Sequence, residues 1–193
     1  MRNVNSRYVV TNKPDCDVVP LSDMKLYLKV STNSDDILIK SLLDSAVILA
    51  EKFMNRDILT TTYQNYRDSF YQDLTLTRGG FQSLVSIEYL KDGVYQSMAV
   101  DDYKASIGGV YGEICNLYNI PTIDCDCNAV RITFKTGFSD DGVDVPEAIK
   151  TAIKSYVAFM YENRGDCGGC ATGKSGFPIQ AEALLSSYKI IKT

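Results

Sequence analysis

Apolar positions at helical spacing predict two long helices. In the first, over residues 35–55, two neighbouring stripes repeat every three or four residues: Leu38, Leu42, Ala46, Leu49 and Phe53, and beside them Ile39, Leu43, Ala46, Ala50 and Met54. The second, over 146–163, carries one apolar face made of Ile149, Ile153, Tyr156, Val157 and Met160. Stripes this wide predict that each helix is buried against more than one element.

Start and stop signals predict the ends of these helices. Ser34 followed by Asp35 and Asp36 favours a helix start, because a side-chain oxygen can cap the free N–H groups and acids suit the positive end of the dipole. Pro146 favours the start of the second long helix, and Gly165 is a candidate for its C-terminal cap. Shorter helices are predicted over 23–29 and 179–190.

The stretch between the long helices has the alternating pattern of β-strands. Strands are predicted over 60–66, 74–77, 84–90, 114–118 and 129–134, and Lys91-Asp92-Gly93 indicates a hairpin turn. The expected fold class is α+β: a helical ring-body of two long helices plus short helices, with an inserted antiparallel β meander. The predicted division is an extended N-terminal arm (1–20), a helical core (21–58 and 137–164), an inserted β region (59–136), and a Gly-rich loop, short helix and C-terminal tail (165–193).

Charge and composition narrow the function. The 193-residue chain has a net charge of −4 and a pI near 4.9, which argues against a surface that grips DNA by neutralising phosphates. This negative charge is still compatible with an acidic pore wall along which DNA slides. The sequence begins without the apolar core of a signal peptide, and no run reaches the roughly 18 apolar residues of a membrane helix. We therefore expect a protein kept in the cytosol or in a particle assembled there, with no membrane partner.

The chain contains no histidine, which removes the commonest general base and every His-containing zinc site. It has six cysteines, and without a secretion signal these indicate reduced thiols or metal ligands. The candidate zinc ligands are the pairs Cys125/Cys127 and Cys167/Cys170. The second long helix, about 25 Å at 1.5 Å per residue, separates the pairs, so a shared site would need neighbouring subunits. Reduced, unpaired thiols are the favoured interpretation.

A phosphate-loop pattern, G-x-x-x-x-G-K-[ST], occurs from Gly168 to Ser175. The pattern binds phosphates when a strand leads into it and a helix follows at once. Here a helix precedes it and Gly176-Phe177-Pro178 follows, so a Gly-rich connector is the favoured interpretation. Adjacent acids such as Asp140 and Asp141 are expected to be turn and helix-start residues rather than catalytic groups.

Three stretches in a fixed order carry a resemblance to a known family. The first is Leu21–Val30 with Asp35–Ile39 and Ala50–Arg56, the second is Thr136–Phe138 leading to Val145–Lys150, and the third is Tyr161–Arg164. Their order is short helix, long helix, β excursion, second long helix and terminal helix. Over residues 20–165 the chain resembles the head-to-tail connector (adaptor) proteins of tailed phages. The Gly- and Cys-bearing segment after Arg164 departs from that pattern.

The resemblance implies a non-enzymatic structural subunit of the virion, at the head–tail interface. Copies of such proteins form a ring, usually of twelve, that docks on the portal protein, extends the DNA channel and offers a platform to the tail or to a second adaptor or stopper protein. No cofactor is implied. We expect the C-terminal segment to anchor on the portal through Leu184, Leu185, Tyr188, Ile190 and Ile191. The alternatives are a zinc-binding interaction module that uses the cysteine pairs and, last, a nucleotide-binding protein.

Overall fold

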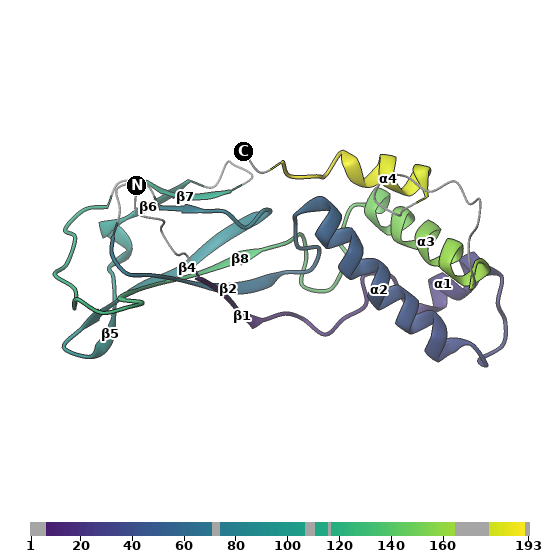
Figure 1. Ribbon diagram of the computed structural model, residues 1–193, viewed down its shortest axis with the longest axis horizontal. Coiled ribbons are helices and arrows are strands. Elements are labelled where there is room, and N and C mark those ends of the chain that lie inside the picture. Colours follow the sequence, from purple (N-terminus) through teal and green to yellow (C-terminus); the bar gives the residue numbers. More distant parts are fainter. Residues whose placement is uncertain (1–6, 71–73, 107–110, 116, 165–177, 192–193) are drawn as a thin grey trace. The chain divides into compact units, whose positions relative to one another are not determined.

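The computed structural model describes residues 7–70, 74–106, 111–115, 117–164 and 178–191, and the chain divides into two compact units (Figure 1). The β unit comprises Met1–Pro14 and Thr60–Gly137, and the helical unit comprises Asp15–Leu59 and Phe138–Thr193. The described residues form α-helices in one unit and antiparallel sheets in the other. The predicted α+β class is confirmed.

The helical unit contains α1 (Leu21–Leu28), α2 (Asp36–Met54), α3 (Glu147–Glu162) and α4 (Ile179–Ser186). Helix α3 packs against both α2 and α4 (Figure 1). All four helices lie where the periodicity predicts them, but α4 ends at Ser186 rather than near 190. The chain beyond α4 turns back onto the end of α2, where the Ile190 N–H donates to the Met54 carbonyl over 2.8 Å.

The two predicted stripes of α2 have different fates. Ile39, Leu43, Ala46, Ala50 and Met54 are buried, and they pack with α3 and α4 in one core. The neighbouring stripe is only half covered: Leu38 and Leu49 are exposed, whereas Leu42 and Phe53 are half-buried. On α3 the buried residues are Ile149, Ala152, Ile153 and Val157. Helix α2 is therefore buried against more than one element, as predicted, but one of its apolar sides is exposed to solvent.

The helix ends differ in detail from the sequence signals. Asp35 occupies the N-cap position of α2 but makes no side-chain capping bond, because its carboxylate binds Tyr161 at the end of α3. Helix α2 ends at Asn55, which adopts the left-handed conformation with φ of 53°. Helix α3 ends with Asn163, whose amide donates to the Phe159 carbonyl over 2.8 Å. The predicted cap Gly165 lies outside the described residues.

The β unit holds two antiparallel sheets rather than a meander. The five-stranded sheet has the order β1 (Arg7–Asn12), β2 (Thr61–Arg67), β8 (Val130–Thr136), β4 (Phe81–Lys91), β5 (Val94–Ser97). The other has the order β3 (Leu74–Leu76), β7 (Gly112–Cys115), β6 (Lys104–Ser106), and a 3₁₀ turn spans Val100–Asp102. In a meander each strand pairs with the next one along the chain. Here β8, late in the sequence, lies between β2 and β4, so that part of the prediction is wrong.

Strict alternation places one face of the large sheet in the core. Strands β2 and β8 each read buried at every second residue, and the buried cluster comprises Tyr63, Leu74, Leu76, Ile87, Met98, Ile114, Val130, Ile132 and Phe134. Phe134 is its centre: the ring is fully buried and stacks on Tyr63 and Phe81, with centroids 5.7 and 6.2 Å away. The other face of the sheet carries polar side chains.

Part of the predicted N-terminal arm is a strand. Residues 7–12 form β1, which pairs antiparallel with β2 from Arg7 opposite Tyr66 to Asn12 opposite Thr62. Residues 15–20 belong to the helical unit, where Val18 and Val19 are buried. The described part of the arm is therefore ordered by contacts within its own chain.

The long segment of the β unit, Thr60–Gly137, begins and ends at neighbouring positions. Thr61, at the start of β2, pairs with Thr136, at the end of β8. In the helical unit, Leu59 forms a bridge with Ser139, and the Phe138 N–H donates to the Ile58 carbonyl over 2.9 Å. In each unit, the chain entering the segment 60–137 therefore bonds to the chain leaving it.

Candidate interaction surfaces

The outward face of α2 is an exposed apolar surface. Ile37 is 88% exposed and Ile48 is 62% exposed, while Leu38 and Leu49 are each 37% exposed. Ser41 and Ser45 lie between these two pairs, and the Ser45 hydroxyl donates to the Ser41 carbonyl over 2.9 Å. Because that donor is satisfied within the helix, covering the face with another apolar surface leaves it bonded. We call these six residues the α2 face.

Exposed apolar side chains also occur on the β unit. Val94, Val100, Tyr118 and Ile120 are between 48% and 75% exposed. Single exposed apolar residues are ordinary on soluble proteins, whereas a face made of several, as on α2, indicates a contact site.

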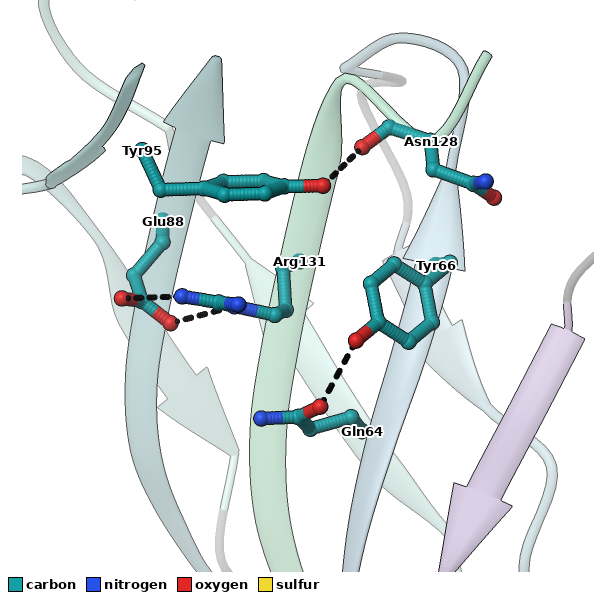
Figure 2. A network of polar contacts seen from close by, with 6 residues as sticks. All are labelled: Gln64, Tyr66, Glu88, Tyr95, Asn128 and Arg131. Carbon is teal, nitrogen blue, oxygen red and sulfur yellow. Dashed lines mark hydrogen bonds and ion pairs between the residues drawn. The ribbon is translucent and has the colours of Figure 1, made fainter.

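A polar network crosses four strands, β2, β8, β4 and β5, on the outer face of the large sheet (Figure 2). Arg131 on β8 lies between Glu88 on β4 and Tyr66 on β2, its partners in the strand register. Its Nε and Nη2 each donate to a different oxygen of Glu88 over 2.8 Å, and its guanidinium lies 4.1 Å from the centre of the Tyr95 ring. The hydrogen bonds to Glu88 raise the pKa of Arg131.

Two tyrosines complete this network. The Tyr95 hydroxyl donates to the Asn128 carbonyl over 2.8 Å, and the Tyr66 hydroxyl donates to Gln64 Oε1 over 2.7 Å (Figure 2). Burial raises the pKa of Tyr95. Since the charged groups and the hydroxyls have partners within the network, we interpret it as a cross-strand tie that supports the sheet.

A second cluster joins the ends of α2 and α3. The Tyr161 hydroxyl donates to the Asp35 carboxylate, Arg164 Nη2 lies 3.4 Å from the same oxygen, and the Arg164 guanidinium lies 4.1 Å from the centre of the Tyr161 ring. The hydrogen bond from Tyr161, aided by the charge of Arg164, lowers the pKa of Asp35. The same hydrogen bond raises the pKa of Tyr161.

Thermal stability is expected to depend on this cluster at both ends of the pH range. Because the pKa of folded Asp35 is lowered, its stabilisation is complete above the ordinary carboxyl pKa and is lost as the pH falls through the lowered value. Because the pKa of folded Tyr161 is raised, its stabilisation is complete below the ordinary tyrosine pKa and is lost as the pH rises through the raised value.

Tm measured against pH should therefore change less steeply at both ends of the pH range in Tyr161→Phe than in the wild type. The control Tyr27→Phe, at an exposed position on α1, should follow the wild type. Identical profiles for Tyr161→Phe and the wild type would contradict the assignment.

A hollow of about 190 Å³ in the helical unit is rich in acids, including Asp17, Asp23, Asp141 and Glu147. Most of these acids have partners: Asp17 pairs with Lys40, and Glu147 lies 3.0 Å from Lys150 Nζ. The Ser139 hydroxyl donates to Asp141 over 2.7 Å, and this hydrogen bond lowers the pKa of Asp141. Asp141 also accepts from the Val143 N–H over 3.0 Å, so it is a turn residue, as the sequence predicts for Asp140 and Asp141.

The cysteines within the described ranges do not form part of a metal-binding cluster. Cys125 and Cys127 are exposed and Cys16 is half-buried, and no cluster of three or more Cys, Asp or Glu side chains within the described ranges has the arrangement of a metal site. The Cys16 thiol donates to the Asp140 carbonyl over 3.2 Å. Burial, together with the nearby acids, raises the pKa of Cys16. The other predicted ligands, Cys167 and Cys170, and the phosphate-loop pattern 168–175 lie outside the described residues, so zinc binding stays a prediction.

The five residues predicted to anchor the C-terminus differ in exposure. Leu185 is fully buried and Ile190 is 6% exposed, and both belong to the subunit's own packing. Leu184 and Tyr188 are half-buried, whereas Ile191 is 76% exposed. Of the five predicted residues, only Leu184, Tyr188 and Ile191 are therefore accessible at the surface of the subunit.

None of the helices in the described stretches is long and apolar enough to span a membrane.

The fold is shared with chains from gene transfer agent (GTA) particles. A chain from the neck of an empty GTA particle computed with C6 symmetry matches with a TM-score of 0.76 at 17% identity, over 97% of each chain. A chain from the virion of the native gene transfer agent (GTA) particle gives 0.76 at 17% identity over 96% of each chain. A chain from the neck of the native GTA particle computed with C12 symmetry gives 0.71 at 16% identity over 97% of each. No protein-family model and no curated protein sequence matches the chain.

Proposed function

We propose that this chain is a structural subunit of the neck of a tailed, phage-like particle. Copies form a ring, with twelve as the expected number, that docks on the portal protein, extends the DNA channel and provides the attachment platform for the tail or a second adaptor or stopper. The observation that carries the proposal is the fold shared with GTA neck chains over 97% of each chain. The symmetries of those necks, C6 and C12, support a cyclic assembly.

The proposed subunit works through surfaces and does not catalyse a reaction. The two polar clusters described above, around Arg131 and around Asp35, consist of groups that bind one another. The α2 face offers apolar area to a neighbour. The net charge of −4 suits a channel through which DNA passes without sequence-specific binding.

The C-terminal tail is proposed to contact the portal through Ile191, with Tyr188 and Leu184 at the margin of the contact. Ile191→Asp is a cleaner test than deletion of residues 179–193, because the deletion also removes Ala181 and Leu185 from the core. The substitution should reduce binding to purified portal while the subunit keeps its Tm. Unchanged binding would refute the anchor but not the neck assignment.

The test of the neck assignment is the composition of particles made by cells that encode this chain. Mass spectrometry of purified particles should detect the polypeptide at the same copy number as the portal. Disruption of its gene should yield DNA-filled heads without tails, visible by electron microscopy, and the intact gene should restore tails. Particles that lack the polypeptide, or that attach tails without it, would overturn the proposal.

A further inference from the structure

The α2 face is symmetric about its own midpoint. Its six positions form three pairs centred on residue 43: Ile37 with Leu49, Leu38 with Ile48, and Ser41 with Ser45. At 3.6 residues per turn, each pair also lies at equal angles on either side of one outward direction. The face therefore reads the same from either end, with large aliphatic residues at both ends and serines in the middle.

We propose that the free protein forms a two-fold dimer in which the α2 faces of two copies pack antiparallel. An interface of this kind uses one surface twice, and its two-fold axis lies in the contact plane, across the two helices. When the α2 face is turned end over end about that axis, its aliphatic ends meet aliphatic ends and its serines lie beside serines. Side chains on the same side of the face then meet: Ile37 of each copy contacts Ile48 of the other, and Leu38 contacts Leu49, at both ends of a contact about 18 Å long. Ser41 and Ser45 meet at the centre, where their small size lets the helices approach closely.

Charge supports the antiparallel direction. Lys52 is exposed on the same side of α2, and its counterpart across the midpoint is position 34, directly before Asp35 and Asp36. In the dimer Lys52 of one copy therefore lies near Asp35 and Asp36 of the other, whose charges are shared with Arg164 and Lys25 of their own chain, and the two helix dipoles run in opposite directions. A parallel arrangement would instead bring Lys52 near Lys52.

The size of the face sets the strength of the dimer. Six residues per copy is fewer than the roughly 20–30 of a stable interface, so the dimer should be weak and depend on concentration. Two copies related by such an axis point in opposite directions, whereas the copies in a ring all point the same way. The dimer is therefore a state outside the ring and must separate when subunits join a neck. It needs only the isolated chain and does not depend on the proposed function.

The test is sedimentation velocity of the full chain over a range of concentrations. The wild type should shift from monomer to dimer, and Ile37→Asp should weaken the dimer at least about tenfold, because the symmetry places the charge in the contact twice. Val143→Asp is the matched control, since Val143 is 69% exposed in the same unit but lies off α2, and it should behave as the wild type. Thermal melts verify that each variant is folded.

Mixing variants tests the register. Ile37→Asp mixed with Ile48→Lys should restore a mixed dimer, because the antiparallel packing brings the introduced carboxylate of one copy against the introduced ammonium group of the other. Ile37→Asp mixed with Ile37→Lys should restore none. Rescue by the second mixture instead of the first, a wild type that stays monomeric or assembles only into rings, or an Ile37→Asp variant that dimerises as the wild type does would each overturn the proposal. None of these outcomes bears on whether particles contain the chain.

Discussion

Replacing Phe134 by alanine is expected to lower the free energy of unfolding by about 3–5 kcal/mol, the largest single-residue effect we foresee in the β unit. The ring is fully buried and stacks on Tyr63 and Phe81, and it meets Tyr8 edge-on with centroids 6.1 Å apart. Its removal loses the transfer free energy of the ring and leaves a cavity that strands on either side of β8 cannot close.

Urea unfolding followed by the near-ultraviolet circular dichroism of the tyrosines would measure this loss, since the chain has 13 tyrosines and no tryptophan. Phe134→Leu is the matched control: it keeps most of the apolar volume and should cost clearly less than the alanine. A cost below about 1 kcal/mol for Phe134→Ala would mean that the cluster repacks and that Phe134 is not its centre.

Glu88→Gln is expected to lower the free energy of unfolding by about 2 kcal/mol. The side chains of Glu88 and Arg131 are only 20% and 24% exposed, so the substitution leaves a largely covered guanidinium without its counter-charge. The Gln side chain can accept only one of the two hydrogen bonds that the carboxylate accepts now.

Two further variants separate the parts of this interaction. Arg131→Lys keeps the charge but loses the fork and the stacking on Tyr95, so it should also destabilise. Lys91→Gln changes an exposed residue at the end of the same strand as Glu88 and should have little effect. If Glu88→Gln cost no more than Lys91→Gln, the pair would behave as an ordinary surface ion pair.

The helices could be predicted from the sequence because their signals are local. Helix α2 is marked by apolar residues three or four positions apart and begins at Asp36, beside the predicted start. Which stripe of α2 is buried could not be predicted, because it depends on where α3 packs, and that contact joins residues about a hundred positions apart. The α2 face therefore emerges only in the folded subunit.

The β topology shows the same limit more strongly. The strands β2, β4 and β8 are visible in the alternation, but nothing local indicates that β8 enters between the other two. Strand β1 escaped prediction because it lies at the sheet edge with four of six residues exposed, which blurs the alternating pattern. The Glu88–Arg131 fork joins residues from strands far apart in sequence, so only the register brings them together.

The closure of the chain on itself at Thr61/Thr136 and Leu59/Ser139 has an evolutionary consequence. Since the entry and exit of the long insertion are neighbours within each unit, a gene could exchange the segment between them without pulling the helices apart. Only β1, supplied from upstream, must be altered together with it. Related proteins are thus free to vary the size and the surface residues of the sheets while the helical unit stays the same, so the β segment can evolve new contacts as a module.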